Sequence, residues 1–149
     1  ADLPQLEDHS ERYGGLYLFA SFSIPEPSLK AMLIEADRFG VPVVFNGFVE
    51  NSVTATEARV RALYEDEAIS HGFIIDPTLF TRFDVVRVPT LVSTLEDLDF
   101  CETCGCSRDP TPGHDRVAGN APLQTLLTVI AKGNADHAGP ARAALEAVQ

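Results

Sequence analysis

The chain has 149 residues, enough for one domain whose core needs no disulfide for stability. Hydrophobic residues make up 45% of it, and no apolar run approaches the ~18 residues of a membrane helix, so we expect no direct membrane insertion. The net charge of −11 repels phosphate backbones and anionic headgroups, which argues against nucleic acid as a direct ligand.

The first fifteen residues, 1–15, are polar and acidic and end in a pair of glycines, which predicts an arm or linker. The sequence opens at Ala1 without the basic and apolar regions of a signal peptide. Either the chain is not exported, or its numbering begins after signal cleavage.

A strand, a helix and a second strand follow the arm. Leu16–Phe22 is apolar almost throughout, which fits a central strand covered on both faces. The next segment predicts an amphipathic helix that ends at Gly40, where glycine suits a left-handed C-cap, and Val41–Phe45 predicts the second strand. The apolar stripe of this helix contains Leu29, Met32, Leu33 and Ala36.

The middle of the chain predicts a second helix and a short third strand. The spacing of Thr54 and Glu57 is that of a capping box, and an amphipathic pattern continues to Ile69. Phe73–Ile75 predicts the strand, which Asp76-Pro77 ends as a turn. Thr78–Phe83 then predicts a single helical turn.

The last third predicts two strands, a long loop between them and a closing helix. The strands are Thr90–Thr94 and Asp115–Ala118. Gly119-Asn120 predicts a tight, hairpin-like turn, and Leu123–Ala131 the helix. We expect the tail, residues 133–149, to be loose, with a short helix over Ala141–Val148 only if a partner or the rest of the domain supports it.

This order of elements predicts an α/β protein. Parallel strand-helix-strand crossovers precede an antiparallel pair and a closing helix, which is the order of the thioredoxin-like fold. We therefore expect residues 16–132 to form a thioredoxin-like domain, with a central mixed sheet of about four to five strands flanked by helices.

The place of the thioredoxin redox motif is occupied by Ser23-Ile24-Pro25-Glu26. In thioredoxins, Cys-x-x-Cys opens the first helix, and the N–H groups at the helix end lower the thiol pKa. An unassisted serine hydroxyl forms neither a thiolate nor a disulfide, so the redox couple is lost at this place. Ser23 and Glu26 predict a helix cap or a plain loop, and Pro27 favours a helix that starts at Pro27 itself.

Val88-Pro89-Thr90 occupies the place of the cis-proline loop of thioredoxins, so we predict a cis bond before Pro89. Two interpretations stay open. The bend only shapes the entrance to the strand, or the groove between Ser23-Ile24-Pro25 and Val88-Pro89-Thr90 accepts a partner strand by sheet-type hydrogen bonds.

Three separated motifs resemble one family. They are Ser21-Phe22-Ser23-Ile24-Pro25 after an apolar strand, Ile75-Asp76-Pro77-Thr78-Leu79-Phe80 before Val88-Pro89-Thr90, and Gly119-Asn120 before the last helix. Together they resemble the TrbC proteins of F-type conjugative transfer systems over residues 16–132. The chain departs from that family at Asn46-Gly47-Phe48, where the family often shows an Arg-Gly pair, and in its longer, cysteine-rich loop.

The resemblance implies a non-enzymatic, thioredoxin-like assembly factor of the conjugative pilus and its type IV secretion system. It implies a periplasmic location, a TraW-like partner together with other secretion components, and no cofactor.

The three cysteines, Cys101, Cys104 and Cys106, admit three interpretations. A disulfide within the loop, engaging Cys101, fits the oxidising periplasm that the resemblance implies. With His114, the three thiols have the ligand types of a zinc site, which would make the chain a small zinc-stabilised binding module. Cys101 and Cys104 instead have the spacing of a dithiol, which would make it a divergent periplasmic thiol-disulfide oxidoreductase or isomerase. The other histidines, predicted to be surface residues, are His9, His71 and His137.

Overall fold

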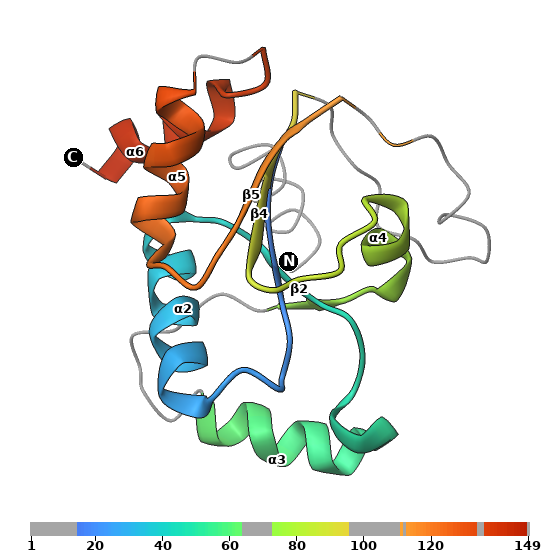
Figure 1. Ribbon diagram of the computed structural model, residues 1–149. Helices are drawn as coiled ribbons and strands as arrows, with labels where there is room; N and C mark the ends of the chain where they lie inside the picture. The colour runs from blue at the N-terminus through green and yellow to red at the C-terminus, as the bar shows by residue number, and fades with distance from the viewer. Residues whose placement is uncertain (1–14, 64–72, 96–110, 112, 134–135, 149) are drawn as a thin grey trace, which may run out of the picture.

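The computed structural model describes residues 15–63, 73–95, 111, 113–133 and 136–148 (Figure 1). No helix within these ranges has both the length and the apolar character needed to cross a bilayer. The elements in chain order are β1 (Leu16–Ala20), α2 (Glu26–Phe39), β2 (Val43–Phe45), the 3₁₀ turn η1 (Val49–Asn51), α3 (Val53–Leu63), β3 (Ile74–Ile75), α4 (Pro77–Arg82), β4 (Thr90–Ser93), β5 (Asp115–Ala118), α5 (Leu123–Lys132) and α6 (Gly139–Val148).

The sheet has five strands in the order β3-β2-β1-β4-β5. β1, β2 and β3 are parallel, whereas β4 runs antiparallel to both β1 and β5. The prediction of an α/β protein with a mixed sheet flanked by helices is therefore confirmed. The strand order is consistent with a thioredoxin-like fold.

Helices lie on both faces of the sheet (Figure 1). α2, α5 and α6 gather on one face, and α4 lies on the other. The strand residues divide between two clusters as the alternation of side chains requires. The cluster under α2, α5 and α6 includes Leu18, Leu29, Leu33, Leu91, Leu127 and Ile130, and the cluster under α4 includes Tyr17, Phe19, Val44, Phe80, Phe83 and Val92.

α2 and α3 differ from the sequence prediction mainly where they begin. α2 begins at Glu26, before Pro27, and ends as predicted at Gly40, whose φ of 71° is left-handed. The capping box predicted at Thr54 is wrong, because the Ser52 hydroxyl accepts the hydrogen bond from the Ala55 N–H at 3.1 Å and α3 already begins at Val53. The predicted end of this helix at Ile69 lies outside the described residues.

The C-terminal part is more ordered than the sequence predicts. Gly119-Asn120 lies, as predicted, between β5 and α5, and the Ala121 N–H donates to the Gly119 carbonyl at 3.0 Å, so the chain turns tightly there from a strand into a helix. The tail is not loose over residues 136–148. α6 buries Ala141 and Ala144 in the larger cluster, and the Arg142 Nε–H donates to the Ala131 carbonyl at 3.2 Å. The body of the domain thus supports this short helix.

Candidate functional site

Within the segment Ser23-Ile24-Pro25-Glu26, the first three residues lie in the loop that joins β1 to α2, and Glu26 is the first residue of α2. The Ile24 N–H donates to the Ser21 carbonyl at 3.1 Å, and the Leu29 N–H donates to the Pro25 carbonyl at 2.9 Å. No side chain caps α2, so the capping interpretation is wrong: Ser23 lies in a plain loop, and Glu26 belongs to the helix.

The recorded hydrogen-bond partner of the Ser23 hydroxyl is another hydroxyl and not a general base. It lies 2.8 Å from the Ser21 hydroxyl, and the Ser23 main-chain N–H donates to the same Ser21 oxygen at 3.1 Å. A hydroxyl partner does not take a proton from serine near neutral pH, so this pair does not make a nucleophile.

The second predicted element, the Val88–Pro89 peptide bond, is cis. The Thr90 hydroxyl donates to the Arg87 carbonyl at 2.6 Å, and the Pro89 carbonyl accepts from the Gly119 N–H at 3.1 Å. The loop is therefore fixed to the start of β4 and to the segment that follows β5.

The structure brings the two predicted elements together. Phe19 of β1 pairs with Thr90 of β4, and continuing this antiparallel register by one step places Ala20 opposite Pro89. The Ser23 loop leaves β1 at the end of the sheet where the Pro89 loop enters β4. This end of the sheet is the candidate functional site.

Arg59 is a member of this site that the sequence analysis missed. Its Nη2–H donates to the Ile24 carbonyl at 3.3 Å, which ties α3 to the loop that contains Ser23. Its Nε is buried and has no recorded hydrogen-bond partner. Nothing local in the sequence indicates the contact, because the two residues are 35 positions apart.

A hollow of about 530 Å³ lies beside the Ser23 loop, on the side of β2. Its polar lining includes the hydroxyls of Ser21 and Ser23, while the Phe22 ring stacks on Phe45 with centroids 4.0 Å apart. The site therefore combines hydrogen-bonding groups with a rigid aromatic support. The full lining is Ser21, Phe22, Ser23, Asn46, Gly47, Phe48, Val49, Glu50 and Asn51.

Residues 18–130 match the family model described as the type-F conjugative transfer system pilin assembly protein, TrbC. The chain belongs to this family. The predicted resemblance is thus confirmed, and the TrbC match spans both the Ser23 loop and the Pro89 loop.

A curated relative, the periplasmic protein TrbC of Escherichia coli (strain K12), is 39% identical over 129 residues. The match covers 86% of this chain and 53% of that protein, so the chain spans about half the length of its relative. No solved structure matches the chain significantly.

The departure from the TrbC pattern at Asn46-Gly47-Phe48 lies in the lining of the hollow. Asn46 is exposed, and the Phe48 side chain is 48% exposed. This chain therefore presents an amide and an aromatic ring in the lining of the hollow.

Cys101, Cys104 and Cys106 lie outside the described residues, so the disulfide, zinc and dithiol interpretations stay predictions. His114, the fourth ligand in the zinc interpretation, packs its ring edge-on against Phe83 with centroids 4.9 Å apart. Among the described residues, no group of three or more His, Cys, Asp or Glu side chains is arranged to hold a metal ion.

His137 differs from its prediction as a surface residue. It is half-buried, its carbonyl accepts from the Ser93 hydroxyl at 2.6 Å, and its Nδ1 is buried without a recorded hydrogen-bond partner. His9 and His71 lie outside the described ranges.

Proposed function

We propose that this TrbC-family chain is a non-enzymatic periplasmic factor in the assembly of a conjugative pilus, acting by protein-protein contact within a type IV secretion system. The observation that carries the proposal is the match of residues 18–130 to the pilin assembly family. The name of the E. coli relative, a periplasmic protein, supports the location.

The chemistry of the candidate site supports a role in binding. Ser23 stands where a thioredoxin carries its attacking cysteine, and its hydroxyl is paired with that of Ser21. A serine in this environment has neither the thiolate nor the activating base that redox or acyl-transfer chemistry requires.

The cis-proline loop supplies a means of docking an extended partner segment. Within the described part of the chain, no hydrogen bond involves the main chain of Val88. Its N–H and C=O are therefore available to a partner strand, which would run between the Pro89 loop and the Ser23 loop. A TraW-like protein of the same transfer system is the partner that we propose for this groove.

Conjugative transfer tests the function directly. A donor strain that lacks its own copy of this gene is complemented with the wild-type chain, exported to the periplasm, and transfer frequency and surface pili are measured. We expect full restoration by the wild-type chain and by the Ser23→Ala variant, because no step uses the hydroxyl as a nucleophile. Loss of transfer with Ser23→Ala alone would contradict the non-enzymatic role.

The rival thiol-disulfide enzyme is tested by insulin reduction with the purified protein. We expect the same rate for the wild-type chain and for a Cys101→Ser, Cys104→Ser double variant. A rate that falls to background only in the double variant would establish the oxidoreductase.

Binding of the TraW-like protein, measured by calorimetry, tests the groove. The Pro25→Asp variant places a charge in the groove while keeping a residue type that is favoured at a helix N-cap, so α2 is preserved. Ala143→Asp, on the exposed face of α6, is the control. We expect only Pro25→Asp to weaken binding, and equal affinities for both variants would rule out this groove.

A further inference from the structure

A second hollow lies over α3, next to the hollow at the candidate site. The second one has a volume of about 430 Å³ and shares Phe48 with the first. We call the two together the trough. Its second half has a mostly apolar lining of Phe48, Val53, Thr56, Glu57, Val60, Arg61, Phe73 and Ile75.

Three aromatic rings support both halves of the trough. Phe22 stacks on Phe45, and Phe73 packs edge-on against both, with centroids 6.0 Å from Phe22 and 5.4 Å from Phe45. Since Phe22 lines the first half and Phe73 the second, this aromatic group makes one continuous, rigid base.

The turn that carries Phe48 is fixed by hydrogen bonds. The Thr56 hydroxyl accepts from the Val49 N–H at 2.8 Å and donates to the Ser52 carbonyl at 2.7 Å. Thr56 is 5% exposed, so both bonds are shielded from water. The half-exposed Phe48 ring and the 59% exposed Val53 side chain are thus presented by a pre-organised turn.

The trough runs along the β3 edge of the sheet. β3 is the last strand on this side, and the Asp76 N–H donates to the Phe45 carbonyl of β2 at 2.9 Å. Because main-chain groups of successive residues point to opposite sides of a strand, the N–H and C=O of Ile75 point away from β2. Within the described part of the chain, no strand pairs with this side of β3.

The other edge of the sheet is protected differently. β5 carries the charged residues Asp115 and Arg116, the type of side chain that discourages pairing with another chain. β3 consists of Ile74 and Ile75 and has no charge. The contrast singles out the β3 edge as the one suited to an added strand.

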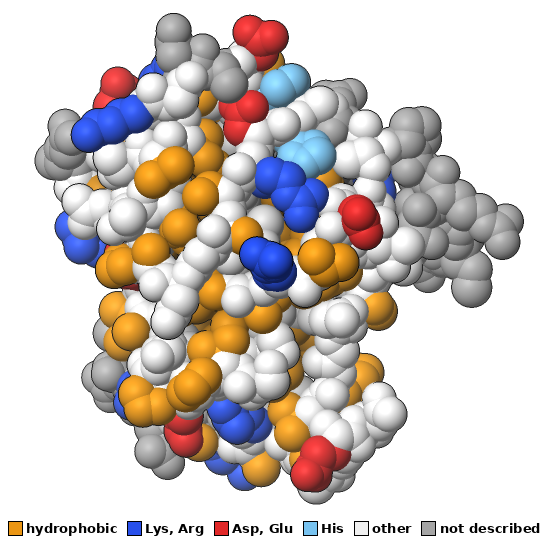
Figure 2. Space-filling view, viewed as in Figure 1, with side chains coloured by type: hydrophobic (Ala, Val, Ile, Leu, Met, Phe, Trp, Pro, Cys, Tyr) orange, Lys and Arg blue, Asp and Glu red, His pale blue; other side chains and the backbone are white. Residues whose placement is uncertain are grey.

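The charges beside the trough select the partner. The carboxylates of Glu50 and Glu57, both exposed, line the trough together with one guanidinium, that of Arg61, in a chain of net charge −11. Figure 2 shows charged and hydrophobic side chains side by side over the end of the molecule where α3 lies. The local field favours a segment that carries lysine or arginine beside its apolar residues.

We propose that the trough binds an extended, basic and apolar segment of another pilus-assembly component, which adds to β3 as an edge strand. Its main chain pairs with Ile75, an aliphatic side chain packs between Val53 and Val60, and a basic side chain lies beside Glu50 or Glu57. This inference rests on the proposed function, since an assembly factor has such partners.

The probe is a short synthetic peptide in which valine alternates with threonine or lysine, titrated into the ¹⁵N-labelled full chain and followed by NMR. We expect shifts at the amides of Phe73–Ile75 and at Val53. Val53→Thr, which keeps the shape of the side chain, should weaken binding by about tenfold because it removes apolar contact. Val129→Thr is the matched control, because Val129 is 50% exposed on α5, away from the trough.

Two further peptides test the stated chemistry. A peptide with glutamate in place of lysine should bind more weakly, and Glu57→Lys should restore part of its affinity. A peptide that is N-methylated at alternate residues loses the donors for sheet pairing and should not bind. Equal binding of the methylated peptide, equal effects of Val53→Thr and Val129→Thr, or no shift at Phe73–Ile75 would each overturn the proposal.

Conjugative transfer separates this proposal from the proposed function. If the wild-type chain restores transfer but the peptide does not bind at the trough, the strand site fails and the assembly role stands. If the peptide binds as expected but the chain does not restore transfer, the assembly role fails and the strand site stands.

Discussion

The helix-covered face of the sheet and the end of the sheet at Ser23 are held in place by different forces. Under α2, α5 and α6, the strands and helices bury aliphatic side chains such as Leu18, Leu91 and Leu127, each 0% exposed. At the Ser23 end, hydrogen bonds between side chains and main chain, such as those of Thr56 and Arg59, hold the loops in position. Burial supplies stability on the face, and hydrogen bonds supply geometry at the end of the sheet.

This difference suits a docking protein. A face of tightly packed aliphatic side chains resists deformation, so the loops at the end of the sheet keep their positions relative to one another. Those loops can then present Phe48, Val53 and the edge of β3 to a partner without a large loss of conformational entropy on binding.

The largest expected loss of stability comes from a substitution on the helix-covered face. Leu127→Ala removes a fully buried side chain of α5, so we expect a loss of about 3–4 kcal/mol in the free energy of unfolding. Urea unfolding followed by circular dichroism measures it. A loss below about 1 kcal/mol would mean that burial on this face does not dominate stability.

Thr56→Val tests how much the side-chain hydrogen bonds at the Ser23 end of the sheet contribute to stability. It keeps the shape of the side chain but leaves the Val49 N–H without its recorded partner, while the Ser52 carbonyl loses the hydroxyl and keeps the Thr56 N–H at 3.0 Å, so we expect a loss of about 1–2 kcal/mol. The amide of Val49 should also exchange faster with solvent, as measured by hydrogen exchange. Thr54→Val, exposed on the same helix, is the control and should change little.

Much of the fold could be predicted from the sequence because apolar periodicity is a local property. The pattern of Leu29, Leu33 and Ala36 indicated α2, and Gly40 indicated its end. β1 was predicted to extend to Phe22 because that residue is apolar, but its ring stacks on Phe45 after the strand has ended at Ala20. Composition alone does not distinguish a strand residue from an aromatic residue in a loop.

The candidate site was predicted only in part. Ser23 and Pro89 were identified because each follows or precedes a recognisable strand. Arg59 and the trough were missed, because they depend on contacts between residues that are distant in the sequence. No local pattern encodes such contacts, and only the packing of α3 against the end of the sheet reveals them.

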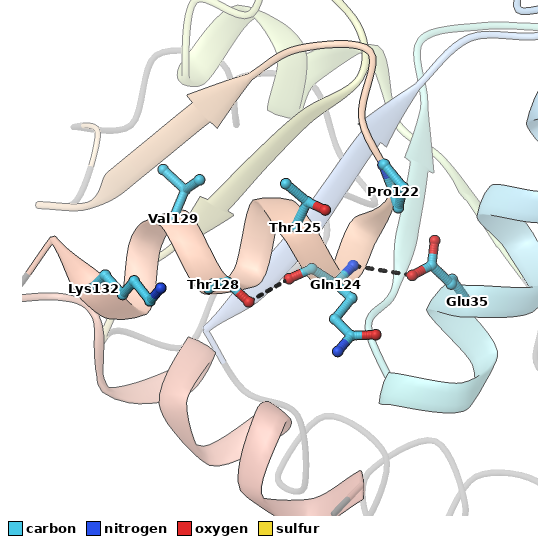
Figure 3. A pocket seen from close by; sticks show the side chains of 7 residues that line it. All are labelled: Glu35, Pro122, Gln124, Thr125, Thr128, Val129 and Lys132. Carbon is cyan, nitrogen blue, oxygen red and sulfur yellow. Dashed lines mark hydrogen bonds between the residues drawn. The ribbon is translucent and has the colours of Figure 1, made fainter.

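Glu35 is an exception to the contrast between a buried face and a hydrogen-bonded end of the sheet, because its side chain forms hydrogen bonds on the helix-covered face. Its carboxylate, on α2, accepts from the Leu123 N–H at 2.9 Å and from the Gln124 N–H at 3.0 Å, and so caps α5 from another helix. Figure 3 shows the hydrogen bond between Gln124 and Glu35. Glu35→Ala should cost about 1 kcal/mol, since two amides at a positive helix end lose an anionic acceptor.

The control for Glu35 is Glu146→Ala, an exposed carboxylate near the end of α6. It should leave the urea midpoint almost unchanged. Equal midpoints for the two variants would show that the cap of α5 contributes nothing to stability and that the face depends on burial alone.

The smallest expected change in stability is a gain, and it comes from a substitution in η1, the turn that follows Phe48. Glu50 has a φ of 51° and a ψ of 29°, a left-handed conformation that glycine adopts without steric cost. Glu50→Gly removes a steric cost of about 1–2 kcal/mol and adds about 0.4–1 kcal/mol of unfolded-state entropy, so it should raise the free energy of unfolding by about 0.5 kcal/mol. Glu57→Gly, inside α3, should lower it by about 1 kcal/mol, because glycine is unfavourable within a helix. If both variants were destabilised equally, the turn at Glu50 would be unstrained, and hydrogen bonds alone would account for the geometry at this end of the sheet.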